Sequence, residues 1–250
     1  MVWILGSPFV EKKNSGDLMI IVRGLIWGLF QFTWIALALL LTAGCLPDGT
    51  WRWQAALVFL VVYAAALALA IVIVGRVSPR SLEARLQKPI SSTQPVADRV
   101  VTTLIGLAFI GWFIFIPFDV FYLKLLPKPY WVISGSGMVL FLLGFLLIVT
   151  AVSQNEFAIP IVKDQSCRHQ TLVDAGVYSL IRHPMYLGLL PFKIGIALWL
   201  ESYAGMASAS VLFFLLVARI RVEEKFLLSA LPGYRQYRQR VRYRLLPYIW

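Results

Sequence analysis

Residue types that could bind a charged ligand gather near the middle of the second half of the chain. Residues 154–186 are polar and end in the run Arg182-His183-Pro184-Met185-Tyr186. Proline suits the first position of a helix, so this run predicts a helix that starts at Pro184 with His183 as its N-cap. The backbone N–H groups of a helix start are unpaired and favour anionic ligands. We therefore expect the amides at His183 to receive the anionic end of a ligand.

A second candidate group follows about thirty residues later. Arg219 and Glu223 are four residues apart, which places them on one face of a helix, and Glu224 follows directly. Adjacent carboxylates where an apolar helix ends are costly unless they have cationic partners. Those partners are either basic residues of the C-terminal tail or a cationic ligand, and the spacing favours neither.

Long apolar segments must position these groups. Four of them carry no charged residue and are long enough to span a bilayer as helices; they are residues 25–46, 53–75, 100–118 and 131–152. A fifth stretch, residues 184–220, is interrupted at Lys193, Glu201 and residues 202–205 and predicts two shorter helices. The sequence thus predicts an all-α integral membrane protein, a multi-span bundle of about five or six transmembrane helices.

Composition agrees with a membrane protein and excludes several other classes. Of 250 residues 60% are hydrophobic and 14% charged, and 23 Lys and Arg against 12 Asp and Glu give a net charge of +11. This balance excludes a typical soluble enzyme, a disordered chain and a disulfide scaffold. Basic residues concentrate in alternate loops and the tail, so the positive-inside rule places both termini and the long loops in the cytoplasm.

The basic excess favours membrane lipids over nucleic acid as a partner, because the basic residues border the spans and no nucleic-acid-binding module is present. Two histidines, His169 and His183, and two cysteines show no metal-binding spacing, so we expect no metal. Lys193 inside an apolar helix either has a function or extends to the cytoplasmic surface. Residues 78–99 either cover the site or merely connect two spans.

A combination of motifs resembles the isoprenylcysteine carboxyl methyltransferase family, whose wider group includes phospholipid N-methyltransferases. It consists of Gly176-Val-Tyr178-x-x-x-Arg182-His183-Pro184-x-Tyr186-x-Gly188, then Glu223-Glu224, then Gly233-Tyr234-x-x-Tyr237. The likeness extends from about residue 155 to 247, roughly a third of the chain. It implies a helical membrane bundle whose C-terminal half encloses S-adenosylmethionine. It also divides the chain into N-terminal transmembrane helices with a cytoplasmic loop, residues 1–130, and a methyltransferase-like domain with a basic tail, residues 131–250.

The resemblance also implies roles for single residues. Arg219 matches the arginine near the acceptor carboxylate. The chain departs from the pattern in three ways. Lys163 and Gln170 stand where eukaryotic members carry a cofactor-binding glutamine and a histidine, and the spacing from Glu223-Glu224 to Gly233-Tyr234 is one residue shorter than in those members. The matched cofactor-binding positions are Leu172, Val173, Tyr178, His183, Pro184, Met185, Tyr186 and Glu223.

The implied activity is methyl transfer to a lipophilic acceptor, first of all the carboxylate of a prenylated cysteine or a similar lipid-like thioether acid. A carboxylate is already ionised and needs no strong base, so Arg219 would orient it by charge-assisted hydrogen bonds. An amine acceptor, such as a phospholipid headgroup, would need a base, for which Glu224 or His183 are the candidates. A non-catalytic membrane scaffold or transporter is the third alternative.

Overall fold

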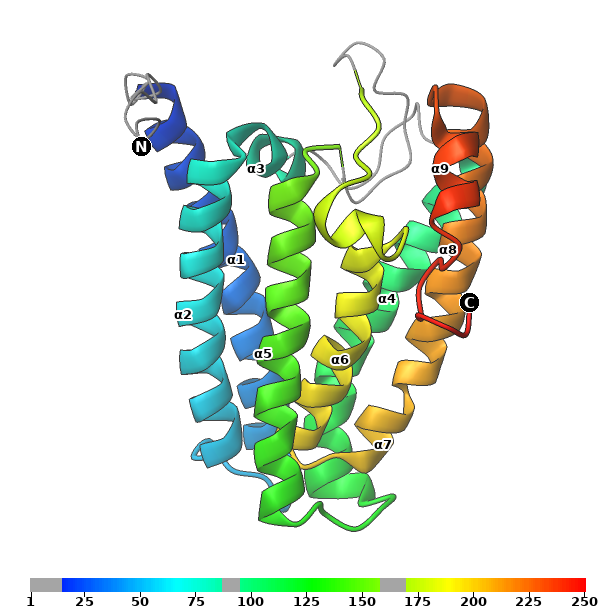
Figure 1. The fold of residues 1–250 in the computed structure, drawn as a ribbon. Helices are drawn as coiled ribbons and strands as arrows, with labels where there is room; N and C mark the ends of the chain where they lie inside the picture. The colour runs from blue at the N-terminus through cyan, green and yellow to red at the C-terminus, as the bar shows by residue number, and fades with distance from the viewer. Residues whose placement is uncertain (1–14, 87–94, 158–169) are drawn as a thin grey trace, which may run out of the picture.

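The computed structural model describes residues 15–86, 95–157 and 170–250, and this part of the chain is helical without a strand (Figure 1). The main helices in chain order are α1 Ser15–Cys45, α2 Gln54–Val77, α3 Pro79–Arg85, α4 Val96–Phe118, α5 Trp131–Gln154, α6 Pro184–Trp199, α7 Tyr203–Ala207, α8 Ala209–Ala230 and α9 Tyr234–Arg240. A π-helical turn, η1 Asp119–Leu123, extends α4, and a 3-10 turn, η3 Gly176–Ser179, precedes α6.

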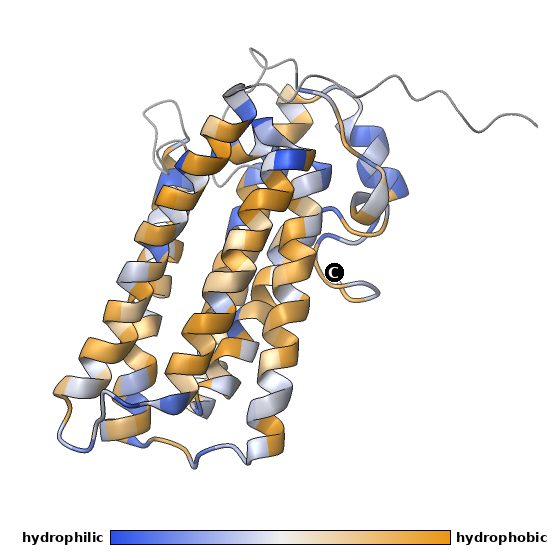
Figure 2. Cartoon of the chain, turned by 90° about the vertical axis from the view of Figure 1, so that its left-hand side faces the viewer, coloured by the Kyte–Doolittle hydropathy of each residue, from blue (hydrophilic) through white to orange (hydrophobic). Residues whose placement is uncertain are grey.

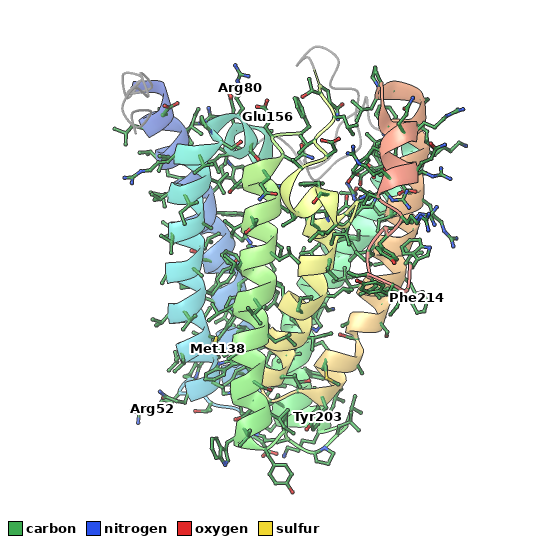
Figure 3. All side chains as sticks on the ribbon, in the orientation of Figure 1. Arg52, Arg80, Met138, Glu156, Tyr203 and Phe214 are labelled. Atoms are coloured by element: carbon green, nitrogen blue, oxygen red, sulfur yellow. The ribbon has the colours of Figure 1, made fainter. Side chains whose placement is uncertain are left out.

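Five helical segments of the described chain are long and apolar enough to cross a membrane, and α6 is a shorter apolar helix. Their shafts are predominantly hydrophobic, whereas hydrophilic residues gather at the ends of the bundle (Figure 2). Large apolar side chains such as Phe30 and Val61 are exposed on these shafts, as contact with lipid tails requires. Phe214 points away from the bundle in the same manner (Figure 3). The predicted multi-span helical membrane bundle is confirmed.

The four uncharged segments all form helices, and α1 begins ten residues before the expected span. The chain breaks at residues 200–202, which confirms the interruption at Glu201, but residues 203–205 of the expected turn are helical in α7. Lys193 lies within an uninterrupted α6. The second helix of that stretch is not short, because α7 and α8 together continue from Tyr203 to Ala230. Arg219 and the two glutamates therefore lie inside α8 and not in a tail beyond it.

Glycines bring α5 and α6 into backbone contact, and this pair is the most extensive helix packing in the described chain. A Cβ atom added to Gly137 would lie 2.7 Å from the carbonyl oxygen of Gly195, and one added to Gly188 would lie 2.8 Å from that of Gly144. Small residues at such positions let membrane helices approach closely. The contact fixes the axis of α6, and hence the position of the His183 segment at its start.

The two ends of the bundle differ in their polar contacts. At one end, where α3 and α9 lie, Arg80 and Glu156 are 3.9 Å apart (Figures 1 and 3). We call this the polar end. At the opposite end, the buried Asp119 accepts a 2.6 Å hydrogen bond from Ser202, which fixes the break between α6 and α7. The start of α6, the start of α4 and the last turns of α8 all reach the polar end (Figure 1).

Candidate functional site

The His183 segment forms the predicted helix start, but its amides are already used. His183 is the N-cap of α6 and Pro184 occupies the first turn, as expected. The C-terminal tail folds back beside this segment, and the N–H groups of Arg182 and His183 donate to the carbonyls of Tyr243 and Arg244, both at 3.0 Å. The expectation that the His183 amide receives an anionic ligand is therefore wrong, because tail carbonyls occupy it.

Glu224 is buried among basic and polar side chains. Its carboxylate oxygens lie 2.6 Å from Arg182 Nη1 and 3.0 Å from Arg244 Nε. His183 Nε2 and the Tyr234 hydroxyl each lie 3.5 Å from it. This carboxylate joins the start of α6, the helix α8 and the C-terminal tail, so its present contacts are those of a structural ion pair.

Glu223 is the more accessible of the two carboxylates, with a quarter of its side chain exposed. It accepts a 2.6 Å hydrogen bond from the Tyr186 hydroxyl and lies 4.0 Å from His183 Nδ1. The rings of His183 and Tyr186 stack with 5.6 Å between their centroids and 9° between their planes. A partly exposed carboxylate thus borders a flat aromatic pair.

Arg219 shares a helix face with Glu223, as its spacing predicts, because the Tyr186 hydroxyl contacts both side chains. Arg219 Nε donates to that hydroxyl at 2.8 Å. Its Nη1 lies 3.1 Å from Asp98 Oδ1 and also donates to the Thr102 hydroxyl. The guanidinium is therefore buried and held from both sides, by α6 and by α4.

Asp98 and Thr102 were not among the predicted site residues. Asp98 is fully buried and lies in the first turn of α4, two residues before the uncharged stretch from which that helix was predicted. An acidic residue at the start of an apolar span is a signal that could have indicated a buried partner. Its partner, Arg219, lies 121 positions later in the chain, and no local spacing predicts that pairing.

Together these side chains form one connected group, which we call the ion cluster. The structure thus brings together the predicted residues His183, Tyr186, Arg219, Glu223 and Glu224. The ion cluster consists of Asp98, Arg182, His183, Tyr186, Arg219, Glu223, Glu224 and Arg244.

The remaining predicted residues lie around the ion cluster. Met185 Sδ is 3.2 Å from Arg85 Nη2, and burial lowers the pKa of that guanidinium to about 10, which leaves it charged at neutral pH. Tyr178 lies in η3, where its hydroxyl donates to the Ala151 carbonyl at 3.3 Å. Burial raises the pKa of the Tyr178 hydroxyl, so this tyrosine stays neutral.

The two predicted residues before η3 face different surroundings. Leu172 packs against the buried Tyr234 and Tyr237 of α9. Val173 lines a cavity of about 400 Å³ between α3 and the end of α5, together with Ser78, Gln154 and Thr171. Lys163, one of the departures from the family pattern, lies outside the described residues.

Lys193 is buried in the interior of the bundle and does not reach the surface. It is 3% exposed, and its Nζ lies 4.4 Å from the centre of the Trp112 ring and 5.8 Å from that of Phe109. The interpretation of a lysine extending to the cytoplasmic surface is therefore wrong.

Among the described residues no group of three or more His, Cys, Asp or Glu side chains could hold a metal ion.

Comparison with known proteins gives one family model and several curated relatives. Residues 133–232 match the family model described as phospholipid methyltransferase. Protein-S-isoprenylcysteine O-methyltransferase B of Arabidopsis thaliana is 32% identical over 117 residues, which are 46% of this chain and 59% of that protein. The A form of the same plant is 30% identical over 102 residues, 40% of this chain and 52% of that protein.

A third relative carries a different description. The cobalt-zinc-cadmium resistance protein CzcN of Cupriavidus metallidurans is 40% identical over 74 residues, 29% of this chain and 34% of that protein. The matched part of the chain thus spans between about a third and three fifths of these relatives' own lengths. The matches confirm the resemblance to isoprenylcysteine carboxyl methyltransferases. The family model covers six of the eight residues of the ion cluster, all except Asp98 and Arg244.

Proposed function

We propose that this protein is an integral-membrane methyltransferase that uses S-adenosylmethionine and acts on a lipophilic acceptor. The first candidate acceptor is the carboxylate of an isoprenylcysteine-like thioether acid. The observation that carries the proposal is the position of Glu223, a partly exposed carboxylate beside the stacked rings of His183 and Tyr186. The other carboxylates of the ion cluster are buried against arginines, so Glu223 is the one with room to meet a cationic ligand.

The residues present fit the cofactor by their chemistry. S-adenosylmethionine supplies a methyl group on a positively charged sulfur, and Glu223 balances that charge. Aromatic faces such as that of Tyr186 attract a cation by about 0.5–2 kcal/mol. His183 Nε2 is buried and lies 3.5 Å from the Glu224 carboxylate, a contact long enough to be exchanged for one with a polar group of the ligand. Tyr178, Pro184 and Met185 complete the binding segment.

Leu172 and Val173 are proposed to contact the cofactor through their backbone. Val173 lines the cavity of about 400 Å³ at the polar end, whose size suits part of a nucleoside. Leu172 packs on α9 and so holds the segment before η3 in place. Backbone contacts from such a segment would bind the cofactor without requiring particular side chains.

The acceptor carboxylate is proposed to lie near Arg219, which would orient it by charge-assisted hydrogen bonds. Methylation of a carboxylate needs no proton removal, so the residues of the site have only to align the acceptor and exclude water. Burial of Arg219 under α4 and α6 supplies the water-poor surroundings for this step.

The second candidate acceptor is an amine of a phospholipid headgroup, and it is supported by the description of the matching family model. Such an acceptor must lose a proton to a base. Glu224 is held by Arg182 and Arg244, so it would have to leave two ion pairs to act as that base. His183 is the better placed candidate, because its Nε2 lies 3.5 Å from Glu224, a looser contact than those that hold the glutamate to its two arginines.

The proposed orientation places both termini and the polar end in the cytoplasm. The exposed basic residues of α8 and α9, such as Arg221 and Arg238, would then lie against anionic lipid headgroups. The cofactor would enter from the cytoplasm, whereas the acceptor would enter from the bilayer.

Two measurements on the purified protein in detergent test the function. Calorimetry should show saturable S-adenosylmethionine binding, and absence of binding at millimolar cofactor would favour a scaffold or transporter. Radiolabelled methyl transfer is then compared with N-acetyl-S-farnesylcysteine and with phosphatidylethanolamine as acceptors. A base-labile label identifies a methyl ester, and a base-stable label identifies a methylated amine.

A further inference from the structure

Asp98 is a buried carboxylate that contacts Arg219, the residue proposed to bind the acceptor. It lies outside the part of the chain that the family model matches. It is 0% exposed, and its Oδ1 lies 3.1 Å from Arg219 Nη1. It belongs to α4, whereas the family match begins at residue 133. The site is therefore completed by a helix that the matched segment does not contain.

The pairing changes what Arg219 offers to an anionic acceptor. A guanidinium that already faces a carboxylate at 3.1 Å is largely neutralised, and a second carboxylate brought to it is repelled by the first. Removal of Asp98 by a rotation of its side chain is costly, because an unpaired charge would then remain in the bundle interior. An anionic acceptor thus needs a positive charge in addition to that of Arg219.

We propose that Asp98 is a specificity-determining residue, which neutralises Arg219 and so makes binding of an anionic acceptor depend on the positive charge of the bound cofactor. This inference rests on the proposed function. It adds a role for α4 and predicts a coupling between two ligands that the contacts of Arg219 alone would not require.

The charges of the ion cluster support this coupling. With His183 taken as neutral, the described residues of the cluster comprise three arginines and three carboxylates, whose charges cancel. S-adenosylmethionine brings one net positive charge and the acceptor carboxylate one negative charge, so the complex of both is again neutral. Arg85, which borders the cluster at Met185, carries the same charge with every ligand and cannot produce the difference.

The reaction would then remove the attraction that assembled the complex. The bond between methyl carbon and acceptor oxygen forms as the bond between that carbon and the cofactor sulfur breaks. The sulfonium becomes a neutral thioether and the carboxylate a neutral ester. Asp98 continues to neutralise Arg219, so neither product is held by a net charge.

Two unreactive cofactor analogues that differ in charge test the proposal. Sinefungin carries a protonated amine in place of the sulfonium, and S-adenosylhomocysteine is neutral at that position. The affinity of N-acetyl-S-farnesylcysteine is measured by calorimetry on protein saturated with either analogue. In the wild type we expect roughly tenfold tighter acceptor binding with sinefungin, a typical size for coupling between two sites. The neutral methyl ester of the same acceptor should show no such preference.

The variant Asp98→Asn removes the charge with little change of shape. It should tighten acceptor binding in the presence of S-adenosylhomocysteine and bring the ratio of the two affinities close to one. Thr102→Val is the matched control, since Thr102 contacts the same nitrogen of Arg219 without a charge, and it should keep the wild-type ratio.

Three results would overturn the proposal. The first is a wild type that binds the acceptor equally well with sinefungin and with S-adenosylhomocysteine. The second is an Asp98→Asn variant that keeps the wild-type ratio of these two acceptor affinities. The third is an equal loss of both acceptor affinities in that variant, which indicates a purely structural role. If Asp98→Asn does not fold, the wild-type comparison of acid and ester decides alone. If neither analogue binds to the wild type, the proposed function itself fails; if both bind without coupling, only the role of Asp98 fails.

Discussion

Tyr186 donates a 2.6 Å hydrogen bond to Glu223, and the same hydroxyl accepts one from Arg219 at 2.8 Å. A single oxygen of α6 thus joins two side chains of α8: Glu223, which is proposed to bind the cofactor, and Arg219, which is proposed to bind the acceptor. This oxygen fixes the side chains of the two proposed binding sites relative to each other. Its removal should therefore affect both ligands without breaking an ion pair of the bundle.

The substitution Tyr186→Phe tests this relationship. It keeps the ring that stacks on His183 but removes the hydroxyl, so Arg219 loses an acceptor and Glu223 a donor. Loss of a hydrogen bond to a charged group costs about 1.5–3 kcal/mol, and we expect S-adenosylmethionine binding to weaken roughly tenfold or more in calorimetry. The helix content in circular dichroism should stay unchanged. Wild-type affinity for both ligands would show that the hydroxyl has no part in either site.

The adjacent glutamates should respond differently to the same substitution. Glu223→Gln removes a partly exposed charge, so it should weaken cofactor binding while the thermal unfolding midpoint in detergent changes little. Glu224→Gln leaves the buried Arg182 and the partly exposed Arg244 without their carboxylate. Breaking a buried pair costs about 3–5 kcal/mol, so this midpoint should fall clearly. The two variants are each other's control, and equal midpoints would contradict the structural role of Glu224.

The C-terminal tail should matter for cofactor binding although no motif marks it. Leu245 is fully buried against α8 and holds the tail whose carbonyls bind the amides of Arg182 and His183. Leu245→Ala removes this anchor at about 2–5 kcal/mol. We expect a lower unfolding midpoint and weaker cofactor binding. Ile249→Ala, at an exposed position of the same tail, is the matched control and should leave both unchanged.

The sequence allowed prediction of most elements because each rests on a local signal. The uncharged stretches predicted the long helices, Pro184 predicted the start of α6, and the four-residue spacing predicted that Arg219 and Glu223 share a face. The partners of these groups could not be predicted in the same way. Asp98 lies far from Arg219 in the chain, and the carbonyls that use the His183 amide belong to a tail without a motif. Pairings of this kind depend on how helices pack, and the spacing of residues along the chain does not predict that packing.

The backbone contact between α5 and α6 predicts that a larger residue at Gly195 lowers the stability of the bundle. A Cβ atom at Gly195 would collide with the backbone of Phe141 and Gly137, whereas one at Gly135 on α5 meets nothing within 4 Å. Gly195→Ala should therefore separate the two helices and lower the unfolding midpoint, because neither backbone can shift aside. Gly135→Ala should be neutral or slightly stabilising, by up to about 1 kcal/mol from helix propensity. Similar midpoints for both variants would contradict the close packing.

Lys193 is a buried ammonium to which no described residue offers a carboxylate, and its position predicts a gain in stability when the charge is removed. The contact with the Trp112 ring returns at most about 2 kcal/mol, which is less than the cost of keeping an ammonium out of water. Lys193→Met keeps the length of the side chain without its charge. We therefore expect the thermal unfolding midpoint in detergent to rise, by an amount equivalent to about 1 kcal/mol or more.

Two comparisons make this last experiment decisive. Ile194→Met, at the neighbouring position of α6, controls for the introduction of a methionine and should leave the midpoint nearly unchanged. A fall of the midpoint in Lys193→Met would mean that the ammonium has an anionic partner in the folded protein. A rise of the midpoint together with a loss of the proposed methyl transfer would instead separate stability from activity. It would indicate that a destabilising buried charge is retained because the proposed reaction needs it.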